Sequence, residues 1–284
     1  MIEIQNPLRQ SNEIIGIKPP SLLKWTGSKR SQAAIIKGLG PHKINRYFEP
    51  FLGGGSVLYF FTENNCLVSD VYSPLIQFWT LVKENPSKVI NYYTKNWQLL
   101  QEDFPGYYYV VRDNFNSKPN GLDLSFLSRT CVNGIIRFNG EGKFNNSIHL
   151  SRRGMVPDKF EEIVNGWHSK LEKVEFMACS FEESLSRCKK GDFVYMDPPY
   201  EGTKQRYISS IDFQLLWNIL DKLNSKGVNW ALSFDGSRGE KEYSVSIPKE
   251  IYITKHDINC GLSALSKVLN AKSEIVTESL YCNY

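Results

Sequence analysis

The sequence predicts an α/β protein in which a sheet built from strand–helix–strand units is interrupted by an insertion. Three observations support this fold class. Short apolar runs bounded by turn residues alternate with segments of helical periodicity. The alternation stops after the second apolar run and gives way to a long, mostly helical stretch. It then resumes near Glu175.

The first strand–helix–strand unit contains a glycine turn. Residues 46–51 read as a strand, residues 53–55 are three glycines, and residues 57–61 are mostly apolar. This order predicts a strand, a tight turn and a helix. The following strand, 66–69, ends in Asp70, where mononucleotide-binding units carry an acidic residue.

The interruption reads as a separate domain. Residues 74–132 predict three or four helices, and residues 135–145 predict a hairpin around a glycine-containing turn. We therefore expect an inserted domain over residues 74–169 and a sheet domain formed by residues 21–73 and 170–284. The later strands of the sheet domain are expected at about 175–179, 192–196, 228–234, 250–256 and 278–283.

Length and composition exclude several classes of protein. A chain of 284 residues with 41% hydrophobic residues can bury a full core. The six cysteines show no zinc-ligand spacing, so we expect reduced thiols and no metal site. No segment approaches the roughly 18 apolar residues of a membrane span, and the first residues lack a secretory signal. These features predict a cytoplasmic protein. The net charge of +4 is compatible with an anionic partner but does not require one.

The segment Asp197-Pro198-Pro199-Tyr200 carries the strongest chemical signal. It follows the predicted strand 193–196, at the strand end where α/β sheets bind ligands. The Asp197 carboxylate and the Pro198 carbonyl are two acceptors held by a stiff turn, and Tyr200 offers a flat ring for a planar base. Such acceptors suit the hydrogens of an exocyclic amine. From these residues alone, a proline turn after a strand explains the segment equally well.

Two further segments suit a small ligand. Gly53 and Gly55 would let a ligand approach the backbone at a helix N-terminus, with Glu49 and Asp70 available for its polar groups. Residues 23–29 place a tryptophan beside a turn and a lysine, a set that can stack on a ligand and pair with a carboxylate. Taken singly, a glycine turn and a surface loop explain these segments as well.

In this order the motifs resemble those of the Dam-type DNA adenine methyltransferases. The resemblance rests on Lys24–Lys29, Phe48–Ser56, Asp70, Arg129–Asn139 and Asp197–Tyr200, and it extends from about residue 22 to the C-terminus. It implies a Rossmann-like, S-adenosylmethionine-dependent methyltransferase sheet with an inserted DNA-recognition domain. It also implies methyl transfer to N6 of a flipped-out adenine at a specific site, with S-adenosyl-L-homocysteine as the product. The implied partners are double-stranded DNA and, in a restriction–modification pair, a restriction endonuclease for the same site. Such an enzyme would be nucleoid-associated through DNA.

The resemblance assigns roles to single residues. Asp197, Pro198, Pro199 and Tyr200 would form the pocket of the target adenine, with Asp197 between adenine and cofactor. Glu278 matches a family acid whose role the motif does not define. The residues implied to line the cofactor pocket are Trp25, Lys29, Glu49, Phe51, Gly53, Gly55, Asp70 and Asp197.

The inserted hairpin would contact DNA. The residues implied to do so are Arg129, Asn133, Ile135, Arg137, Lys143 and Ser147. Arg137 stands where the family carries an arginine that reads guanine, which suits a guanidinium fork. Phosphate contacts are expected from the basic residues Arg129, Lys143, Arg152 and Arg153, although a solvated surface is the alternative for the last two. The bacterial Dam enzyme has other residues at Val132, Ile135 and Ser147, so recognition of GATC does not follow.

Two other functions stay open on the sequence alone. One is methylation of another planar amine or amide, such as a protein glutamine or a ribosomal RNA adenine. In those families the motif usually begins with Asn rather than Asp197, and the inserted segment is absent. The other is a DNA-binding protein that has kept the fold and lost transfer, against which the intact motifs argue.

Overall fold

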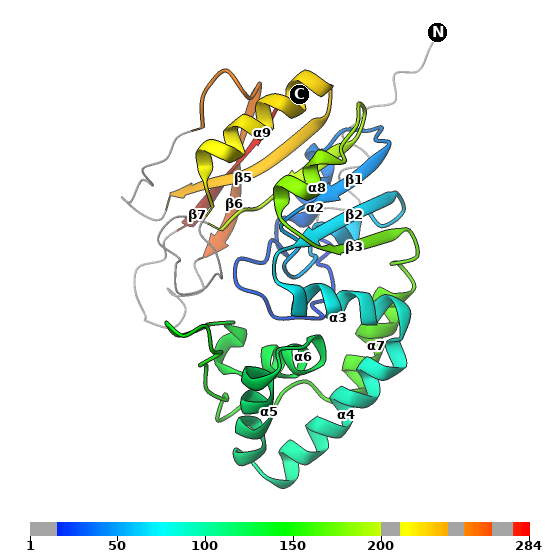
Figure 1. Ribbon diagram of the computed structural model, residues 1–284, viewed down its shortest axis with the longest axis vertical. Helices are drawn as coiled ribbons and strands as arrows, with labels where there is room; N and C mark the ends of the chain where they lie inside the picture. Colours follow the sequence, from blue (N-terminus) through cyan, green and yellow to red (C-terminus); the bar gives the residue numbers. More distant parts are fainter. Residues whose placement is uncertain (1–15, 200–210, 238–246, 263–274) are drawn as a thin grey trace.

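A seven-stranded sheet in the order β3-β2-β1-β4-β5-β7-β6 organises the molecule (Figure 1). The computed structural model describes residues 16–199, 211–237, 247–262 and 275–284. Five strands run parallel, and they are β1 (Arg46–Glu49), β2 (Asn65–Asp70), β3 (Val174–Ala178), β4 (Phe193–Met196) and β5 (Asn229–Ser237). Strand β7 (Ile275–Cys282) lies antiparallel between β5 and β6 (Thr254–Leu262). The α/β fold class predicted from the sequence is confirmed.

The strand order reverses between β1 and β4. Strand β1 pairs with β2 on one side and with β4 on the other, in parallel register. Ligands of open α/β sheets bind outside the carboxyl ends of the strands at such a switch point. The residues that end β1 and follow β4, Glu49 and Asp197, therefore belong to one edge of the sheet.

Side chains alternate along the strands because both faces of the sheet are covered. In β4, Phe193 and Tyr195 join one hydrophobic cluster and Val194 and Met196 join another. Helices α8 (Phe181–Ser186) and α9 (Phe213–Lys226) cover the second cluster. The Asp212 side chain caps the start of α9, and a left-handed Gly227 ends it.

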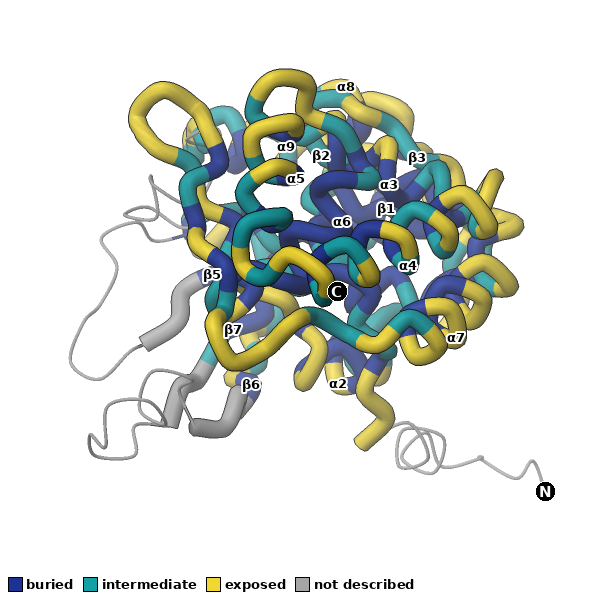
Figure 2. Tube along the Cα trace, turned by 90° about the horizontal axis from the view of Figure 1, so that it is seen from below, coloured by how far each residue is buried: buried dark blue, intermediate teal, exposed yellow. Residues whose placement is uncertain are grey.

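Helices α2 (Ala33–Leu39) and α3 (Ser73–Glu84) cover the first cluster. Helices α4 (Pro86–Glu102), α5 (Gly106–Ser117), α6 (Gly121–Thr130) and α7 (Pro157–His168) complete the helical end of the molecule (Figure 1). Helix α6 runs through its centre with nine of ten residues buried (Figure 2). A Cβ on Gly121 would lie 2.5 Å from the backbone nitrogen of Phe78, so glycine allows α6 to approach α3 closely.

The helical insertion and the sheet share one hydrophobic cluster. Tyr47 of β1, Trp79 of α3 and Trp167 of α7 all belong to it and are fully buried. The inserted residues therefore pack directly on the sheet. Among the described helices, none combines the length and apolar character needed to cross a membrane.

The predicted hairpin is confirmed by an antiparallel bridge between Phe138 and Phe144, with backbone bonds between Asn139 and Lys143 and between Asn145 and Arg137.

Two local predictions were wrong in detail. Residues 57–61 form only a short 3-10 helix, Leu58–Phe60, because β2 already begins at Asn65. The strand expected at 250–256 begins at Thr254, because a turn closed by the Ile251 amide and the Pro248 carbonyl precedes it.

Candidate active site

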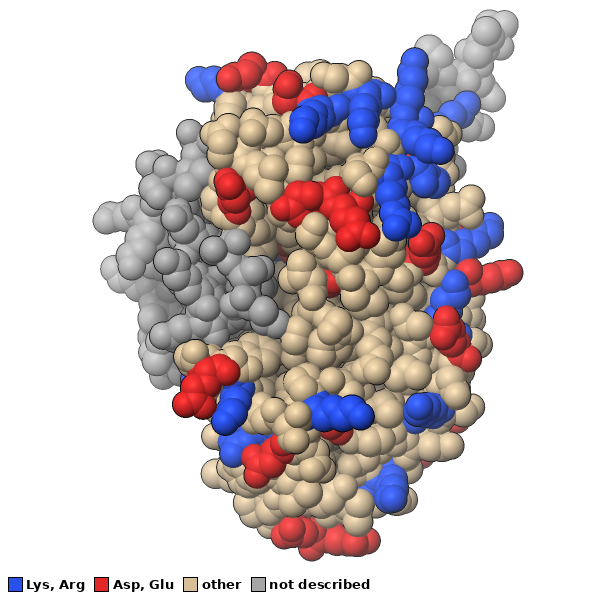
Figure 3. Space-filling view, viewed as in Figure 1, with Lys and Arg blue, Asp and Glu red and all other residues tan. Residues whose placement is uncertain are grey.

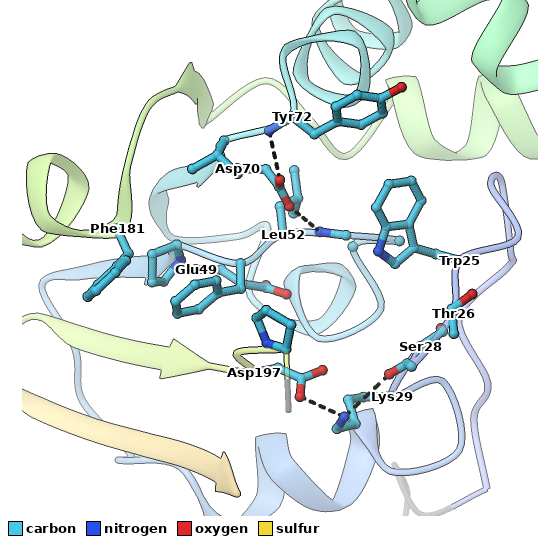
Figure 4. Close-up of a pocket in the computed structure, with 18 of the residues that line it drawn as sticks. Trp25, Thr26, Ser28, Lys29, Glu49, Leu52, Asp70, Tyr72, Phe181 and Asp197 are labelled. Atoms are coloured by element: carbon cyan, nitrogen blue, oxygen red, sulfur yellow. Dashed lines mark hydrogen bonds and ion pairs between the residues drawn. The ribbon is translucent and has the colours of Figure 1, made fainter. Parts of the chain in front are cut away.

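A cavity of about 330 Å³ opens at the carboxyl ends of β1 and β4. Its walls come from the loop before α2, the turns after β1 and β2, the loop after β3, the residues after β4 and the inserted hairpin. Figure 4 shows Trp25, Asp70 and Asp197 around it, with Lys29 beside Asp197. The structure brings together here all eight residues predicted for a cofactor pocket: Trp25, Lys29, Glu49, Phe51, Gly53, Gly55, Asp70 and Asp197.

The glycine turn is shaped by two tryptophans. Gly53 and Gly55 have φ angles of 48° and 65°, which disfavour other residues. A Cβ on Gly53 would lie 2.8 Å from Cδ1 of Trp25, and one on Gly55 would lie 2.9 Å from Cζ2 of Trp79. Trp79 also donates its indole hydrogen to the Gly53 carbonyl at 3.2 Å. Both glycines are therefore required by backbone conformation and by close approach.

Asp70 closes the turn from the second strand. Its carboxylate accepts from the backbone amides of Gly53 at 3.3 Å and Tyr72 at 3.0 Å. Burial raises the pKa of Asp70 to about 6, although these amides oppose the shift. The group is thus an ionised acceptor at neutral pH, oriented by two backbone donors.

Glu49 is a buried carboxyl at the end of β1. The Tyr47 hydroxyl donates to its Oε2 at 2.7 Å, and the residue is 3% exposed. Burial raises the pKa of Glu49 to about 8, and nearby Asp197 contributes in the same direction. The carboxyl is therefore mostly protonated at neutral pH.

Lys29 joins two carboxylates at the edge of the cavity. Its Nζ lies 2.7 Å from Oδ1 of Asp197 and 2.9 Å from Oε1 of Glu278. Burial would lower the pKa of Lys29, but the two carboxylates raise it above its ordinary value. Burial raises the pKa of Asp197 to about 6, with Lys29 opposing the shift and Glu278 adding to it. The sequence suggested that Lys29 pairs with a carboxylate, and in the structure the protein supplies that carboxylate.

The segment after β4 is partly described. Pro198 is buried and Pro199 lines the cavity beside Asp197. Tyr200, expected to stack on the target base, lies outside the described residues. Its role stays a prediction.

Several cavity residues were missed by sequence reasoning. The loop after β3 contributes Ser180, Phe181 and Glu182, and the hairpin contributes Ile136 and Phe138. The first three follow the carboxyl end of a parallel strand, so the predicted topology could have placed them here. The hairpin residues carry no such signal, because their position depends on how the insertion packs against the sheet.

The hairpin residues predicted to contact DNA differ in exposure. Asn133, Arg137, Lys143 and Ser147 are exposed, and Ile135 is half-buried. The Arg137 Nε donates to Oδ1 of Asn145 at 2.9 Å, which orients its guanidinium. These residues lie together on one loop.

The prediction that Arg129 contacts DNA was wrong. It is 7% exposed, and its Nε donates to the Leu22 carbonyl at 2.9 Å. Burial lowers the pKa of Arg129 to about 10. The reason is its place on α6, the central helix of the insertion, so it joins this helix to the N-terminal segment rather than facing phosphates.

The hairpin also contacts the loop that bears Trp25. A Cβ on Gly134 would lie 2.4 Å from both Cβ and Cδ of Lys24, so the lysine stem rests on this glycine. The preceding Asn133 has a φ of 56°, unusual for a residue other than glycine. Lys24 and Trp25 thus contact the hairpin and the glycine turn respectively.

Charge alone does not mark a binding surface. In Figure 3, basic side chains gather toward the upper right of the face in view, and basic and acidic side chains are mixed over its lower half. Within the described ranges, no three His, Cys, Asp or Glu side chains gather closely enough to hold a metal ion. The cavity, rather than surface charge or a metal cluster, therefore identifies the candidate active site.

The comparisons with known proteins agree with this geometry. The sequence model of the family described as "D12 class N6 adenine-specific DNA methyltransferase" matches residues 25–257. The type II methyltransferase M1.LlaDCHI of Lactococcus lactis subsp. cremoris is 27% identical and aligns over 98% of this chain and 99% of its own length. The type II methyltransferase M.MjaIII of Methanocaldococcus jannaschii is also 27% identical, over 93% of this chain and 97% of its own. A DNA adenine methylase of Vibrio cholerae is 29% identical over 64% of this chain and 66% of its own. The chain therefore belongs to the D12 class of N6 adenine-specific DNA methyltransferases.

Proposed function

We propose that this adenine-N6 DNA methyltransferase modifies one short, specific site in duplex DNA and does so on an adenine flipped into the cavity beside Asp197. The observation that carries the proposal is the Asp197 carboxylate at the cavity edge. Lys29 binds its Oδ1, while its Oδ2 has no hydrogen-bond donor among the residues that the structure describes. An oriented acceptor is therefore available to a ligand amine.

The residues of the cavity fit S-adenosyl-L-methionine. Glu182 lines the cavity, and its buried Oε2 has no hydrogen-bond partner within the described part of the chain, so it suits a ligand amine. Gly53 and Gly55 leave a cradle that any Cβ would fill. When bound, the cofactor supplies the methyl group and leaves as S-adenosyl-L-homocysteine. Asp70 would accept from the ribose hydroxyls, and Trp25 with Phe51 would form apolar walls.

Asp197 and Pro198 would hold the target amine. Two acceptors on the N6 hydrogens favour a pyramidal nitrogen whose lone pair can attack the methyl carbon. A carboxylate with a pKa near 6 is ionised at neutral pH and can accept, but it is far too weak a base to deprotonate a neutral amine beforehand. The proton leaves during or after transfer. Extrusion of the adenine costs a few kcal/mol, which Pro199 and Tyr200 would partly offset.

The insertion would read the DNA. We assign residues 74–169 as the recognition domain, and residues 21–73 with 170–284 as the catalytic domain. The exposed hairpin supports this assignment, with contacts from Asn133, Ile135, Arg137, Lys143 and Ser147. The type II names of two relatives support a restriction endonuclease of the same specificity as a partner.

The test is methylation of unmodified genomic DNA by the purified protein with S-adenosyl-L-methionine, read at base resolution for N6-methyladenine. We expect methylated adenine in one short recurring context. The Asp197→Ala variant should lose transfer by at least 100-fold, on the order expected for misplaced reacting groups, while still binding cofactor.

A matched control is Asp192→Asn at the opposite end of β4, where Asp192 bonds Arg46 at 2.6 Å. This variant should lose stability and keep transfer. Methylated adenine without a common context would contradict site specificity. Full activity of Asp197→Ala would contradict the assigned role of Asp197.

A further inference from the structure

We propose that Glu278 is a positioning residue for methyl transfer, because it holds the Lys29 ammonium against Asp197 and so fixes the carboxylate that receives the target amine. This inference rests on the proposed role of Asp197. Among the described residues, Glu278 is not one of those that line the cavity, and its ion pair with Lys29 links it to Asp197.

The geometry of Lys29 supports the proposal. Its ammonium has three donors, and the described residues place these acceptors around it: Oδ1 of Asp197 at 2.7 Å, Oε1 of Glu278 at 2.9 Å and the Gly27 carbonyl at 3.3 Å. An ammonium held from three sides has a defined position. The shortest of these contacts, from Lys29 Nζ to Oδ1 of Asp197, therefore also fixes the position of the Asp197 carboxylate.

Glu278 and Asp197 share the Lys29 ammonium as a common partner. The Lys29 and Asp197 side chains are 7% and 19% exposed, and the Glu278 side chain is 14% exposed. At such low exposure, water screens the charges weakly, so Glu278 acts on Asp197 directly as well as through Lys29.

The sheet itself aims Glu278 at this point. Strand β7 returns antiparallel between β5 and β6, and Glu278 is paired with Gly236 of β5. The register of β5 shifts between Phe234 and Gly236, immediately at this pairing. Bulges beside active sites commonly re-aim a side chain. The irregularity thus coincides with the residue that contacts Lys29.

Removal of Glu278 should change the titration of Asp197 in a defined direction. The charged and titratable groups that act on Asp197 come from four parts of the fold: Lys29 before α2, Glu49 on β1, Tyr195 on β4 and Glu278 on β7. Glu278 raises the pKa of Asp197 and Lys29 lowers it. Loss of the Glu278 charge therefore lowers that pKa.

The experiment compares wild type, Glu278→Gln and Glu278→Asp in single-turnover transfer over a pH series. We expect Glu278→Gln to reduce the transfer rate about 10-fold, with little change in KM for DNA. The acid limb of its pH–rate profile should move to lower pH. Glu278→Asp keeps the negative charge, so the acid limb of its pH–rate profile should lie at the wild-type pH. Ser279→Ala on the same strand, which removes a bond to Asp257 instead, should match wild type in both respects.

Two further measurements separate positioning from damage. Carbon-13 NMR of labelled aspartate should show the lower Asp197 pKa in the free Glu278→Gln protein, without cofactor or DNA. In a Lys29→Met background, adding Glu278→Gln should cause no further loss of rate, because the pathway through Lys29 is already absent.

Several outcomes would overturn the inference. An unchanged Asp197 titration in Glu278→Gln is one, and an equal loss of rate in the wild-type and Lys29→Met backgrounds is another. Failure of the wild-type protein to methylate DNA would instead overturn the proposed function, so the two failures are distinguishable. Thermal unfolding of each variant identifies any loss that is due to unfolding.

Discussion

Glu49 is held by its surroundings in the protonated form. It is buried against the Tyr47 hydroxyl, and its folded pKa of about 8 lies well above its ordinary value of 4.5. A carboxyl whose pKa rises on folding stabilises the native state fully at low pH. That contribution is lost as the pH rises from the unfolded pKa through the folded pKa.

The variant Glu49→Gln should remove this pH dependence. Its amide oxygen can still accept from Tyr47, but it cannot ionise. We expect wild type and variant to have similar melting temperatures near pH 4.5, with wild type falling below the variant by several degrees at pH 9. Calorimetry at a series of pH values measures the difference. A gap that stays constant from pH 4.5 to 9 would contradict the raised pKa.

Single residues of the site were predictable where a motif and a strand end coincide. Glu49, Asp70 and Asp197 each terminate or follow a parallel strand, so the sheet topology brings them together whatever the loops do. The pairing of Lys29 with Glu278 was not predictable. It depends on the register of an antiparallel strand far along the chain, which the motif spacing does not encode.

At the scale of the element, the glycine turn is the most constrained part of the cavity. Gly53→Ala would place a methyl group 2.8 Å from the Trp25 ring at a φ of 48°. We expect cofactor affinity to fall about 10-fold or more, because the ring or the turn must move. Isothermal titration calorimetry with S-adenosyl-L-homocysteine measures this.

The matched control for the turn is Gly166→Ala. Gly166 lies in α7, and a Cβ there meets nothing within 4 Å. This variant should bind the ligand normally and gain about 0.5–1 kcal/mol of stability, because alanine favours the helix. Equal affinity of Gly53→Ala and wild type would show that the turn tolerates a side chain.

The hairpin should carry sequence preference through Arg137. Asn145 accepts from its Nε at 2.9 Å through Oδ1 and from its Nη2 at 3.4 Å through the backbone carbonyl, and these two contacts would orient the guanidinium toward a base edge. Arg137→Ala should lose about 1–3 kcal/mol of discrimination at one guanine of the site, read as relaxed context in methylated genomic DNA. Lys143→Ala, on the same loop, should weaken binding for all sequences and reduce its salt dependence. An unchanged context in Arg137→Ala would assign the reading to another residue.

Element prediction succeeded where periodicity is strong. The strands at Val174–Ala178 and Phe193–Met196 match their predicted positions within a residue. The hairpin forms where the sequence predicts it, but Asn116 takes up part of its backbone hydrogen bonding. The Asn116 side chain accepts from the Phe144 amide and donates to the Phe144 carbonyl. Such tertiary competition cannot be read from local sequence.

At the scale of the molecule, the insertion and the sheet share one hydrophobic cluster, which predicts cooperative unfolding. Trp79 belongs to the shared cluster and meets Trp167 edge to face, at a centroid distance of 4.8 Å. We expect one unfolding transition, with far-UV circular dichroism and tryptophan fluorescence coinciding. Trp79→Ala should lower the stability by about 3–5 kcal/mol and keep a single transition. Two separate transitions would contradict the shared core.

We expect the contacts of Lys24 and Trp25 to couple DNA binding to cofactor binding. These neighbouring residues contact different parts of the molecule: Lys24 packs on Gly134 of the hairpin, and Trp25 packs on Gly53 of the glycine turn. A ligand that moves Gly134 or Gly53 would displace the side chain that rests on it. Because Lys24 and Trp25 are adjacent in the chain, this displacement would also affect the other glycine. Thermodynamic reciprocity then requires that DNA alter the affinity for cofactor by the same factor as cofactor alters the affinity for DNA. An affinity measured with either ligand alone therefore describes only one side of a four-state cycle.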